Sequence, residues 1–243
     1  WLKTLDKYIR AALDDGFTVV LDVHDNISCD KDTENCATKL QLAWDQIASR
    51  YKDESNKLLF ELLNEPFGKL TPEIWNVLSR SLLKVVRRSN PTRNVVIGPA
   101  GYGKLEYLST LQLPSDDRHI VVAVHYYWPP RFTHQGVEWI PEFAHITGLT
   151  FGSDEQQAKI AQDFDQIKAW SKANNRPIFL GEFGAYERSD MASRATYISS
   201  ITRKAEALGF PWAFWEFENN FAAYDMKRAE WVGPILQALV PKN

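Results

Sequence analysis

The chain has little of several features that mark particular classes of protein. It has only two cysteines among 243 residues, Cys29 and Cys36, in a polar stretch with no C-x-x-C motif and no histidine pair nearby. This pattern argues against a zinc site and leaves a local disulfide, closing a short loop, or two free thiols as alternatives. Neither a G-x-G-x-x-G motif nor a P-loop is present, and Gly101-Tyr102-Gly103 is only a weak approximation. A nucleotide-dependent enzyme is therefore the least favoured class.

Long apolar runs and blocks of like charge are also absent. Lysine and arginine number 28 against 31 aspartates and glutamates, and the resulting net charge of −3 is spread along the chain. This argues against a nucleic-acid partner. No run approaches the roughly 18 to 20 apolar residues that span a bilayer, and Trp1-Leu2-Lys3-Thr4 shows neither an initiating Met nor a signal-type stretch. We expect a soluble chain with no membrane partner, either mature or truncated.

The chain does contain enough apolar residues, 44% with nine tryptophans, for a sizeable core. Helical and strand patterns alternate along it. We expect helices over 5–13, 38–51, 72–88, 105–111, 154–173, 193–208 and 232–239, and strands over 17–24, 58–63, 94–98, 120–127, 177–182 and 211–216. Thr71 and Pro72 form a start signal for the third helix. The longest irregular segment is 128–153, and no linker divides residues 1–243, which we expect to form one domain.

Strands that are almost wholly apolar and linked by helices predict a parallel sheet covered on both faces. A doubly wound sheet and a (β/α) barrel both fit this pattern. Polar or aromatic residues stand at the carboxyl ends of nearly every expected strand: Asp22, His24, Asn64, Glu65, His125, Tyr127, Glu182, Trp215 and Glu216. Active sites built from many strand ends are typical of the barrel, which is the fold we expect.

Two of these residues, Glu65 and Glu182, form a candidate catalytic pair. Taken alone, Glu65 could be a solvated loop residue and Glu182 could pair with a helix terminus. Both occupy equivalent strand ends, however, and barrel closure could bring them face to face. Carboxylates about 5 Å apart suit retaining glycoside hydrolysis, with one as acid/base and the other as nucleophile. Asn64 could then bind a sugar hydroxyl, and Tyr127 could donate a hydrogen bond to an ionised Glu182.

Four strings in order, LLFELLNEP, VVAVHYYWP, PIFLGEFGAY and PWAFWEF, resemble glycoside hydrolase family 5, the cellulase-type retaining enzymes. The resemblance implies a (β/α)8 barrel, hydrolysis without cofactor or metal, and Glu65 as acid/base with Glu182 as nucleophile. It also implies substrate-binding roles for five residues. Asn64 would hold the sugar 2-hydroxyl, His24, His125 and Tyr127 would form a polar ring around the sugar, and Trp215 would be its stacking platform.

Other residues are weaker candidates. Trp128, Phe132 and Trp139 lie in the long irregular segment, where they could stack on a glucan or pack in the core. Five further acids are weaker candidates: Asp22, Asp45, Glu61, Glu216 and Glu218. We expect Glu61 to be a hydrogen-bonded barrel residue and Asp45 to be a solvated helix residue. Glu216 and Glu218 are more consistent with a structural role than with substrate binding.

Matched to the family, the expected strands correspond to strands 3 to 8, so we expect an incomplete six-stranded (β/α)6 barrel. The first two strands, and the arginine that the family carries at the end of the second, have no counterpart. We therefore expect a weakened or substituted charge partner for Glu182. A fragment, a natural short barrel, and a homo-oligomer that covers the open strand edges all remain open.

The function that these observations favour is an endo-acting β-1,4-glucanase acting on cellulose or soluble β-glucan. Mannan, xyloglucan and mixed-linkage glucan remain alternative substrates, since loop contacts decide specificity. A non-catalytic carbohydrate-binding barrel is a second class, although such a protein would not need both glutamates. A metal-dependent hydrolase using His24 and His125 is a third, disfavoured because no strand carries a His-x-His pair. The resemblance, together with the size of the substrate, implies secretion.

Overall fold

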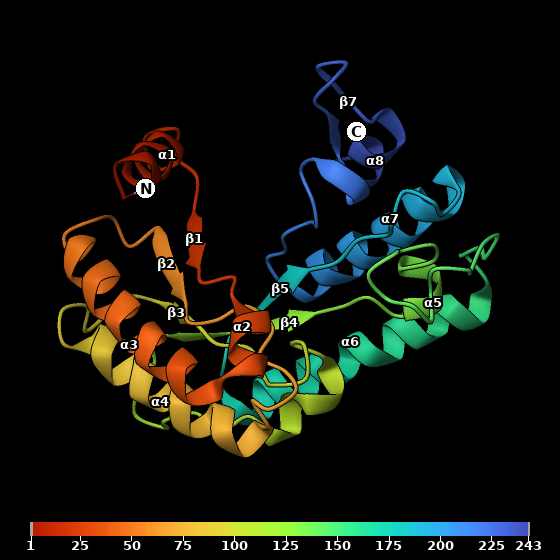
Figure 1. Ribbon diagram of the computed structural model, residues 1–243. Coiled ribbons are helices and arrows are strands. Elements are labelled where there is room, and N and C mark those ends of the chain that lie inside the picture. The colour runs from red at the N-terminus through yellow and green to blue at the C-terminus, as the bar shows by residue number, and fades with distance from the viewer. Residues whose placement is uncertain (1, 243) are drawn as a thin grey trace. The chain divides into compact units, whose positions relative to one another are not determined.

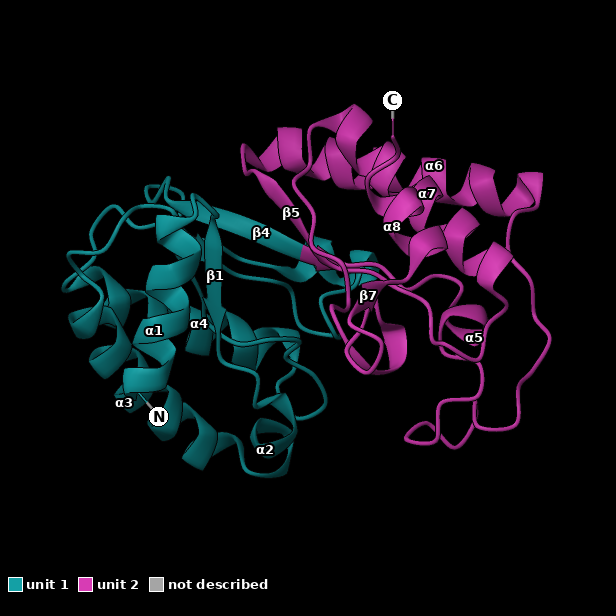
Figure 2. Ribbon diagram, turned by 90° about the horizontal axis from the view of Figure 1, so that it is seen from above, with its two compact units in different colours: residues 1–123 teal, residues 124–243 magenta. Residues whose placement is uncertain are grey.

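The computed structural model describes residues 2–242, so Trp1 and Asn243 lie outside the described residues. The chain divides into two compact units, residues 1–123 and 124–243 (Figure 2). Strand β4 (Ile120–His125) begins in the first unit and ends in the second. That residues 1–243 act as one catalytic domain stays a prediction.

The first unit alternates parallel strands with helical segments (Figure 1). Its elements are α1 (Leu2–Asp14), β1 (Val19–Asp22), α2 (Asn26–Lys31), α3 (Thr33–Arg50), β2 (Leu58–Glu61), α4 (Pro72–Arg87), β3 (Val95–Val96), the 3-10 helix η1 (Leu105–Thr110) and the start of β4. The strands pair in the order β1-β2-β3-β4, with Val19 opposite Leu58, Phe60 opposite Val95, and Val95 opposite Ile120. Because the pairing is parallel, the carboxyl ends of these strands lie at one edge.

Local sequence signals explain where most of these helices begin. Thr71 accepts a hydrogen bond from the Ile74 amide at 3.5 Å and Pro72 is the first helical residue of α4, as predicted. Helix α3 begins earlier than predicted, because the Asp32 side chain caps it by accepting from the Asn35 amide at 3.1 Å. Both cysteines lie in helices, Cys29 in α2 and Cys36 in the first turn of α3, and they form a disulfide, one of the two alternatives that the sequence left open.

Two tryptophans attach the long helices to the strand ends. Trp44 of α3 and Trp75 of α4 are fully buried, and their Nε1 atoms donate to the carbonyls of Leu62 at 2.9 Å and Gly98 at 2.8 Å. These carbonyls lie just beyond β2 and β3, and α3 packs against α4 (Figure 1). A buried carbonyl that loses its donor costs about 1 to 3 kcal/mol, so the two indoles fix the segments that leave the sheet.

The second unit contains the end of β4 and the elements that follow it. These are α5 (Pro130–Thr133), α6 (Asp154–Asn174), β5 (Ile178–Glu182), α7 (Met191–Leu208), the 3-10 helix η2 (Asn219–Phe221), β6 (Tyr224–Asp225), β7 (Glu230–Trp231) and α8 (Gly233–Leu239). The short antiparallel hairpin β6–β7 was not predicted from the sequence. Helix α7 packs against both α6 and α8.

Strand β5 has a neighbour on each side. The Tyr126 amide donates to the Glu182 carbonyl at 2.9 Å beside the end of β4. On the other side, the amides of Leu180 and Ala213 donate to the carbonyls of Pro211 and Leu180, each at 2.9 Å. The sixth predicted strand is therefore present only as an extended segment. It makes a single parallel bridge, between Leu180 and Trp212. Strands β1 to β5 are likewise shorter than predicted, β5 by a single residue.

The segment predicted to be irregular, 128–153, is irregular apart from α5. Gln135 orders it from within, since its buried amide donates to the Leu149 carbonyl at 2.9 Å and accepts from the Leu149 amide at 3.0 Å. None of the helices in the described part of the chain combines the length and apolar character needed to cross a membrane.

Candidate active site

Glu182 is the last residue of β5, and its carboxylate faces His125, the last residue of β4, and Tyr127, two residues beyond that strand. The Tyr127 hydroxyl donates to Glu182 Oε2 at 2.9 Å, which confirms the hydrogen bond expected from the sequence. His125 Nδ1 lies 3.6 Å from the same oxygen, and the two side chains are 4% and 13% exposed. The hydrogen bond from the phenol favours the charged form of the carboxylate in this partly desolvated place.

Strand geometry explains why these residues meet. Side chains alternate between the faces of a strand, so His125 and Tyr127 lie on one face and Tyr126 lies on the other. Tyr126 is buried there, with its hydroxyl donating to Asp163 at 2.9 Å, and its carbonyl accepts from the Tyr197 hydroxyl at 2.7 Å. This anchored residue fixes its two neighbours.

Glycines next to Glu182 leave room for the surrounding groups. A Cβ at Gly181 would lie 2.8 Å from His125 Nε2, and a Cβ at Gly184 would clash with the Trp215 carbonyl. The Trp215 amide donates to the Phe183 carbonyl at 2.9 Å, so Trp215 follows the same edge as Glu182 and is half-buried. The Trp215–Glu216 peptide bond is cis.

In the first unit, Asp22, His24 and Asn64 form a chain of polar contacts beyond β1 and β2. Asp22 Oδ2 lies 3.2 Å from His24 Nδ1, and His24 Nε2 lies 3.2 Å from Asn64 Nδ2. A carboxylate only accepts, so in the neutral form of His24 the proton lies on Nδ1 and Nε2 accepts from Asn64. Asn64 is buried, and its amide donates to the Val23 carbonyl at 2.9 Å. Asp22, a weak candidate from sequence, orients His24.

Glu65 follows Asn64 with a left-handed backbone, at φ 44°. Asn26 Nδ2 donates to the Glu65 carbonyl at 3.2 Å, and the Tyr102 amide donates to the Pro66 carbonyl at 3.3 Å. Burial raises the pKa of Tyr102, and the negative charges of Glu65 and Asp30 raise it further. The Tyr102 ring stacks on Phe67 with centroids 4.5 Å apart. Glu65 therefore lies near aromatic and acidic residues that were not predicted from the sequence. The two glycines that flank Tyr102 were the sequence signal at this place.

Comparison with known proteins identifies the family. The family profile described as Cellulase (glycosyl hydrolase family 5) matches residues 1–221. Endoglucanase H of Acetivibrio thermocellus is 31% identical over an alignment of 245 positions, which covers 98% of this chain and 26% of that protein. The chain belongs to glycosyl hydrolase family 5.

Solved structures agree with this family assignment. Thermotoga maritima Cel5A, solved in complex with cellobiose, is 39% identical, with a TM-score of 0.96 over 98% of this chain and 78% of that one. The Clostridioides difficile cellulose synthase subunit Z is 36% identical, with a TM-score of 0.94 over 98% and 79%. With the alternation of parallel strands and helices, these matches confirm the prediction of an incomplete (β/α) barrel. The chain spans 26% and 32% of the length of two curated relatives, Endoglucanase H and cellulase/esterase CelE of A. thermocellus.

The remaining candidates of this family 5 chain separate into core and surface residues. Phe132 is 1% exposed and is a core residue, whereas Trp139 is 58% exposed and its ring meets Tyr186 edge-on. Trp128 is half-buried with the Lys159 ammonium 5.7 Å from its ring centre.

The weaker acids also have distinct places. Asp45 is exposed and lies 3.6 Å from Arg88, as expected for a solvated helix residue, and Glu61 is buried in β2. Burial raises the pKa of Glu216, whose carboxylate accepts from Asn219 at 3.5 Å. Glu218 is exposed and directly precedes η2.

Proposed function

We propose that the chain is the catalytic part of an endo-acting retaining β-1,4-glucanase, with Glu182 as nucleophile and Glu65 as acid/base. The contact of Tyr127 and His125 with Glu182 in a chain of family 5 carries this proposal. The names of the relatives support it, since several are endoglucanases.

The chemistry follows from the two carboxyl groups. Glu65 donates its proton to the leaving glycosidic oxygen while the Glu182 carboxylate attacks the anomeric carbon, which gives a glycosyl-enzyme ester. Glu65, now ionised, then takes a proton from water as that water releases the sugar with retained configuration. This mechanism requires the two carboxyl groups to stand about 5 Å apart.

Substrate contacts come from the other residues at the strand ends. Asn64 precedes Glu65 and contacts His24, and Trp215 follows the same strand edge as Glu182, so these three side chains are the proposed sugar contacts. Tyr127 supplies a hydrogen-bond donor to the Glu182 carboxylate, and His125 supplies a polar neighbour.

Reducing-sugar release from carboxymethyl cellulose, β-mannan and lichenan tests the proposal, with the parent beside Glu65→Gln and Glu182→Gln. We expect the parent to cleave a glucan. Glu65→Gln should lose about 10²- to 10⁴-fold, the usual contribution of a general acid. Glu182→Gln should lose roughly 10⁶-fold, the scale for removal of a nucleophile. Matching circular dichroism spectra would show that both variants are folded.

A folded parent that binds glucan but cleaves none of the three polymers would contradict the proposal and favour a carbohydrate-binding barrel. β-Mannan is the second candidate substrate, because Thermotoga maritima Cel5A, 39% identical, is solved with mannotriose. Secretion belongs to the same proposal, and the Cys29–Cys36 disulfide is consistent with an oxidising compartment. An oligomer that covers a strand edge stays a prediction.

A further inference from the structure

Helix α2 lies against the chain that leaves β2, and three hydrogen bonds join the two segments. Asn26 Nδ2 donates to the Glu65 carbonyl at 3.2 Å. The Lys69 amide donates to the Asp30 carboxylate at 2.8 Å, and Lys69 Nζ donates to the Lys31 carbonyl at 3.0 Å. Gly68 allows this approach, since a Cβ there would clash with the Asp30 carboxylate. Helix α2 therefore contacts residues 65–69 at both ends.

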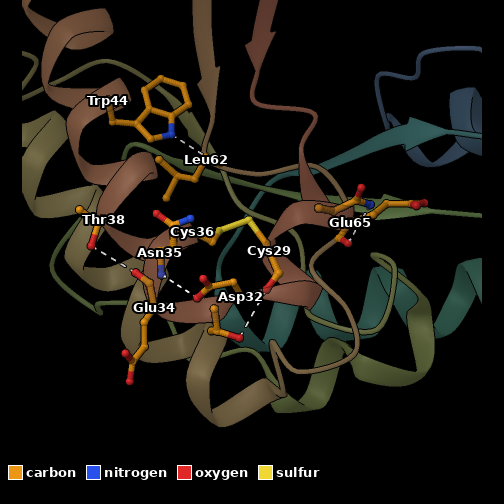
Figure 3. Close-up of a disulfide and its surroundings, with 11 residues drawn as sticks. Cys29, Asp32, Glu34, Asn35, Cys36, Thr38, Trp44, Leu62 and Glu65 are labelled. Atoms are coloured by element: carbon orange, nitrogen blue, oxygen red, sulfur yellow. Dashed lines mark hydrogen bonds between the residues drawn. A yellow bond between two sulfur atoms is a disulfide. The ribbon is translucent and has the colours of Figure 1, made fainter.

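Helix α2 is too short to be stable without contacts to the rest of the unit. It has six residues, and the side chain of its N-cap residue, Asp25, makes no capping hydrogen bond. Isolated helices well beyond this length are marginal in water, so its position depends on its attachments. The strongest attachment is covalent: Cys29 of α2 is bonded to Cys36 of α3, and both cysteines are buried (Figure 3).

The other end of this attachment returns to the same strand. Helix α3 carries Trp44, whose indole donates to the Leu62 carbonyl at 2.9 Å (Figure 3). A frame thus runs from Leu62 through Trp44 and α3 to the disulfide, and through α2 and Asn26 to Glu65. It fixes the chain at two points three residues apart, and we call it the α2–α3 frame.

Glu65 has a backbone that needs such support. Its φ of 44° lies in the left-handed region, which is strained for a residue with a side chain and persists when surrounding contacts determine it. The Asn26 bond acts on the carbonyl of this residue, so it orients the peptide plane beside the Cα that carries the carboxyl group.

We propose that Asn26 is a positioning residue for the Glu65 carboxyl group, and that the Cys29–Cys36 disulfide keeps Asn26 in place. This rests on the function proposed above, in which Glu65 protonates the leaving group. Loss of the bond displaces the acid and leaves the nucleophile in place. The cost therefore falls on substrates whose leaving group needs a proton.

The test compares kcat/KM on phenyl β-cellobioside, whose leaving group needs a proton, and on 2,4-dinitrophenyl β-cellobioside, whose leaving group does not. We expect Asn26→Ala to lose about 10- to 100-fold on the phenyl substrate, the scale of an ångström-level misplacement, and little on the dinitrophenyl substrate. Asn35→Ala is the matched control: it removes the same type of side chain from an exposed position near the disulfide (Figure 3), and should change neither value.

A variant with Cys29→Ala and Cys36→Ala should show the same substrate dependence as Asn26→Ala, with a lower Tm. Equal losses of kcat/KM on both substrates, or unchanged activity in Asn26→Ala, would overturn the inference. The proposed function would still stand, because the parent would be active. A parent inactive on both substrates would overturn the proposed function, and the inference with it.

Discussion

The two candidate catalytic glutamates are held in different ways. Glu182 lies on a regular strand, and the groups that orient it contact its carboxylate directly, Tyr127 at 2.9 Å and His125 at 3.6 Å. Glu65 lies beyond its strand with a left-handed backbone, and Asn26 contacts its carbonyl. The contacts of Tyr127 and His125 reach the side chain of Glu182, and the Asn26 bond reaches the main chain of Glu65.

This difference fits the two proposed roles. A nucleophile works as a carboxylate, and a fixed donor to its oxygen stabilises that charge. An acid/base must exist in both protonation states during one turnover, so support that acts on its backbone serves both states equally. The comparison teaches that a contact with the backbone can help to position a carboxyl group in both of its protonation states.

The largest expected effect within this comparison is on the Glu182 side. Tyr127→Phe removes a hydrogen bond to a charged group, worth about 1.5 to 3 kcal/mol, so kcat/KM should fall about 10- to 150-fold. The loss should appear on both phenyl and dinitrophenyl β-cellobiosides, since the nucleophile attacks in both reactions. Tyr8→Phe, at a position 67% exposed on α1, is the control and should leave both unchanged. A loss confined to the phenyl substrate would break the comparison.

A smaller effect is expected at the far side of the α2–α3 frame. Trp44→Phe leaves the Leu62 carbonyl without its indole donor and should lower the free energy of unfolding by about 1 to 3 kcal/mol in urea titrations. Trp75→Phe breaks an equivalent bond, to Gly98, outside the frame and should cost a similar amount.

The two tryptophan variants are then compared on the phenyl substrate. Only Trp44→Phe should also lower kcat/KM there, by a modest factor, because only its bond belongs to the frame around Glu65. Equal activities in the two folded variants would show that the frame does not reach the acid.

The smallest effect concerns the exposed ion pair between α1 and the end of α3. Asp6 accepts from Arg50 Nε at 2.7 Å and from the Tyr51 hydroxyl at 2.9 Å. The hydrogen bond from Arg50 lowers the pKa of Asp6 from 3.8 to about 2. Since the pKa is depressed on folding, the stabilisation is complete above about pH 4 and is lost as the pH falls toward 2.

Asp6→Asn should therefore be slightly less stable than the parent at neutral pH, and the difference should close near pH 2. Thermal unfolding at a series of pH values measures this. Activity on both aryl cellobiosides should not change. This result would show that the α2–α3 frame does not depend on the ion pair at Asp6. A stability difference that persists at pH 2 would count against the ion pair.

Much of the fold was predictable because its signals are local. The capping pair Thr71 and Pro72, the apolar strands and the polar residues at their ends all follow from short stretches of sequence. The bond from Tyr127 to Glu182 was also predictable, since both residues stand at strand ends. The sixth strand was not, because apolar content alone does not determine how far a ladder of hydrogen bonds continues.

The frame around Glu65 could not be predicted for the opposite reason. Asn26 and Glu65 are 39 residues apart, and no local pattern distinguishes Asn26 from an ordinary polar loop residue. The sequence could not decide between a disulfide and two free thiols, because proximity along the chain does not establish that two thiols meet.

The sequence by itself determined the alternation of strands and helices, the glutamates at strand ends and the family. Periodicity and short motifs carry that information within a few residues. Only the tertiary structure brought Tyr127 and His125 to the carboxylate of Glu182, and Asn26 to the carbonyl of Glu65. Those contacts join distant segments, and their geometry exists only once the chain has packed.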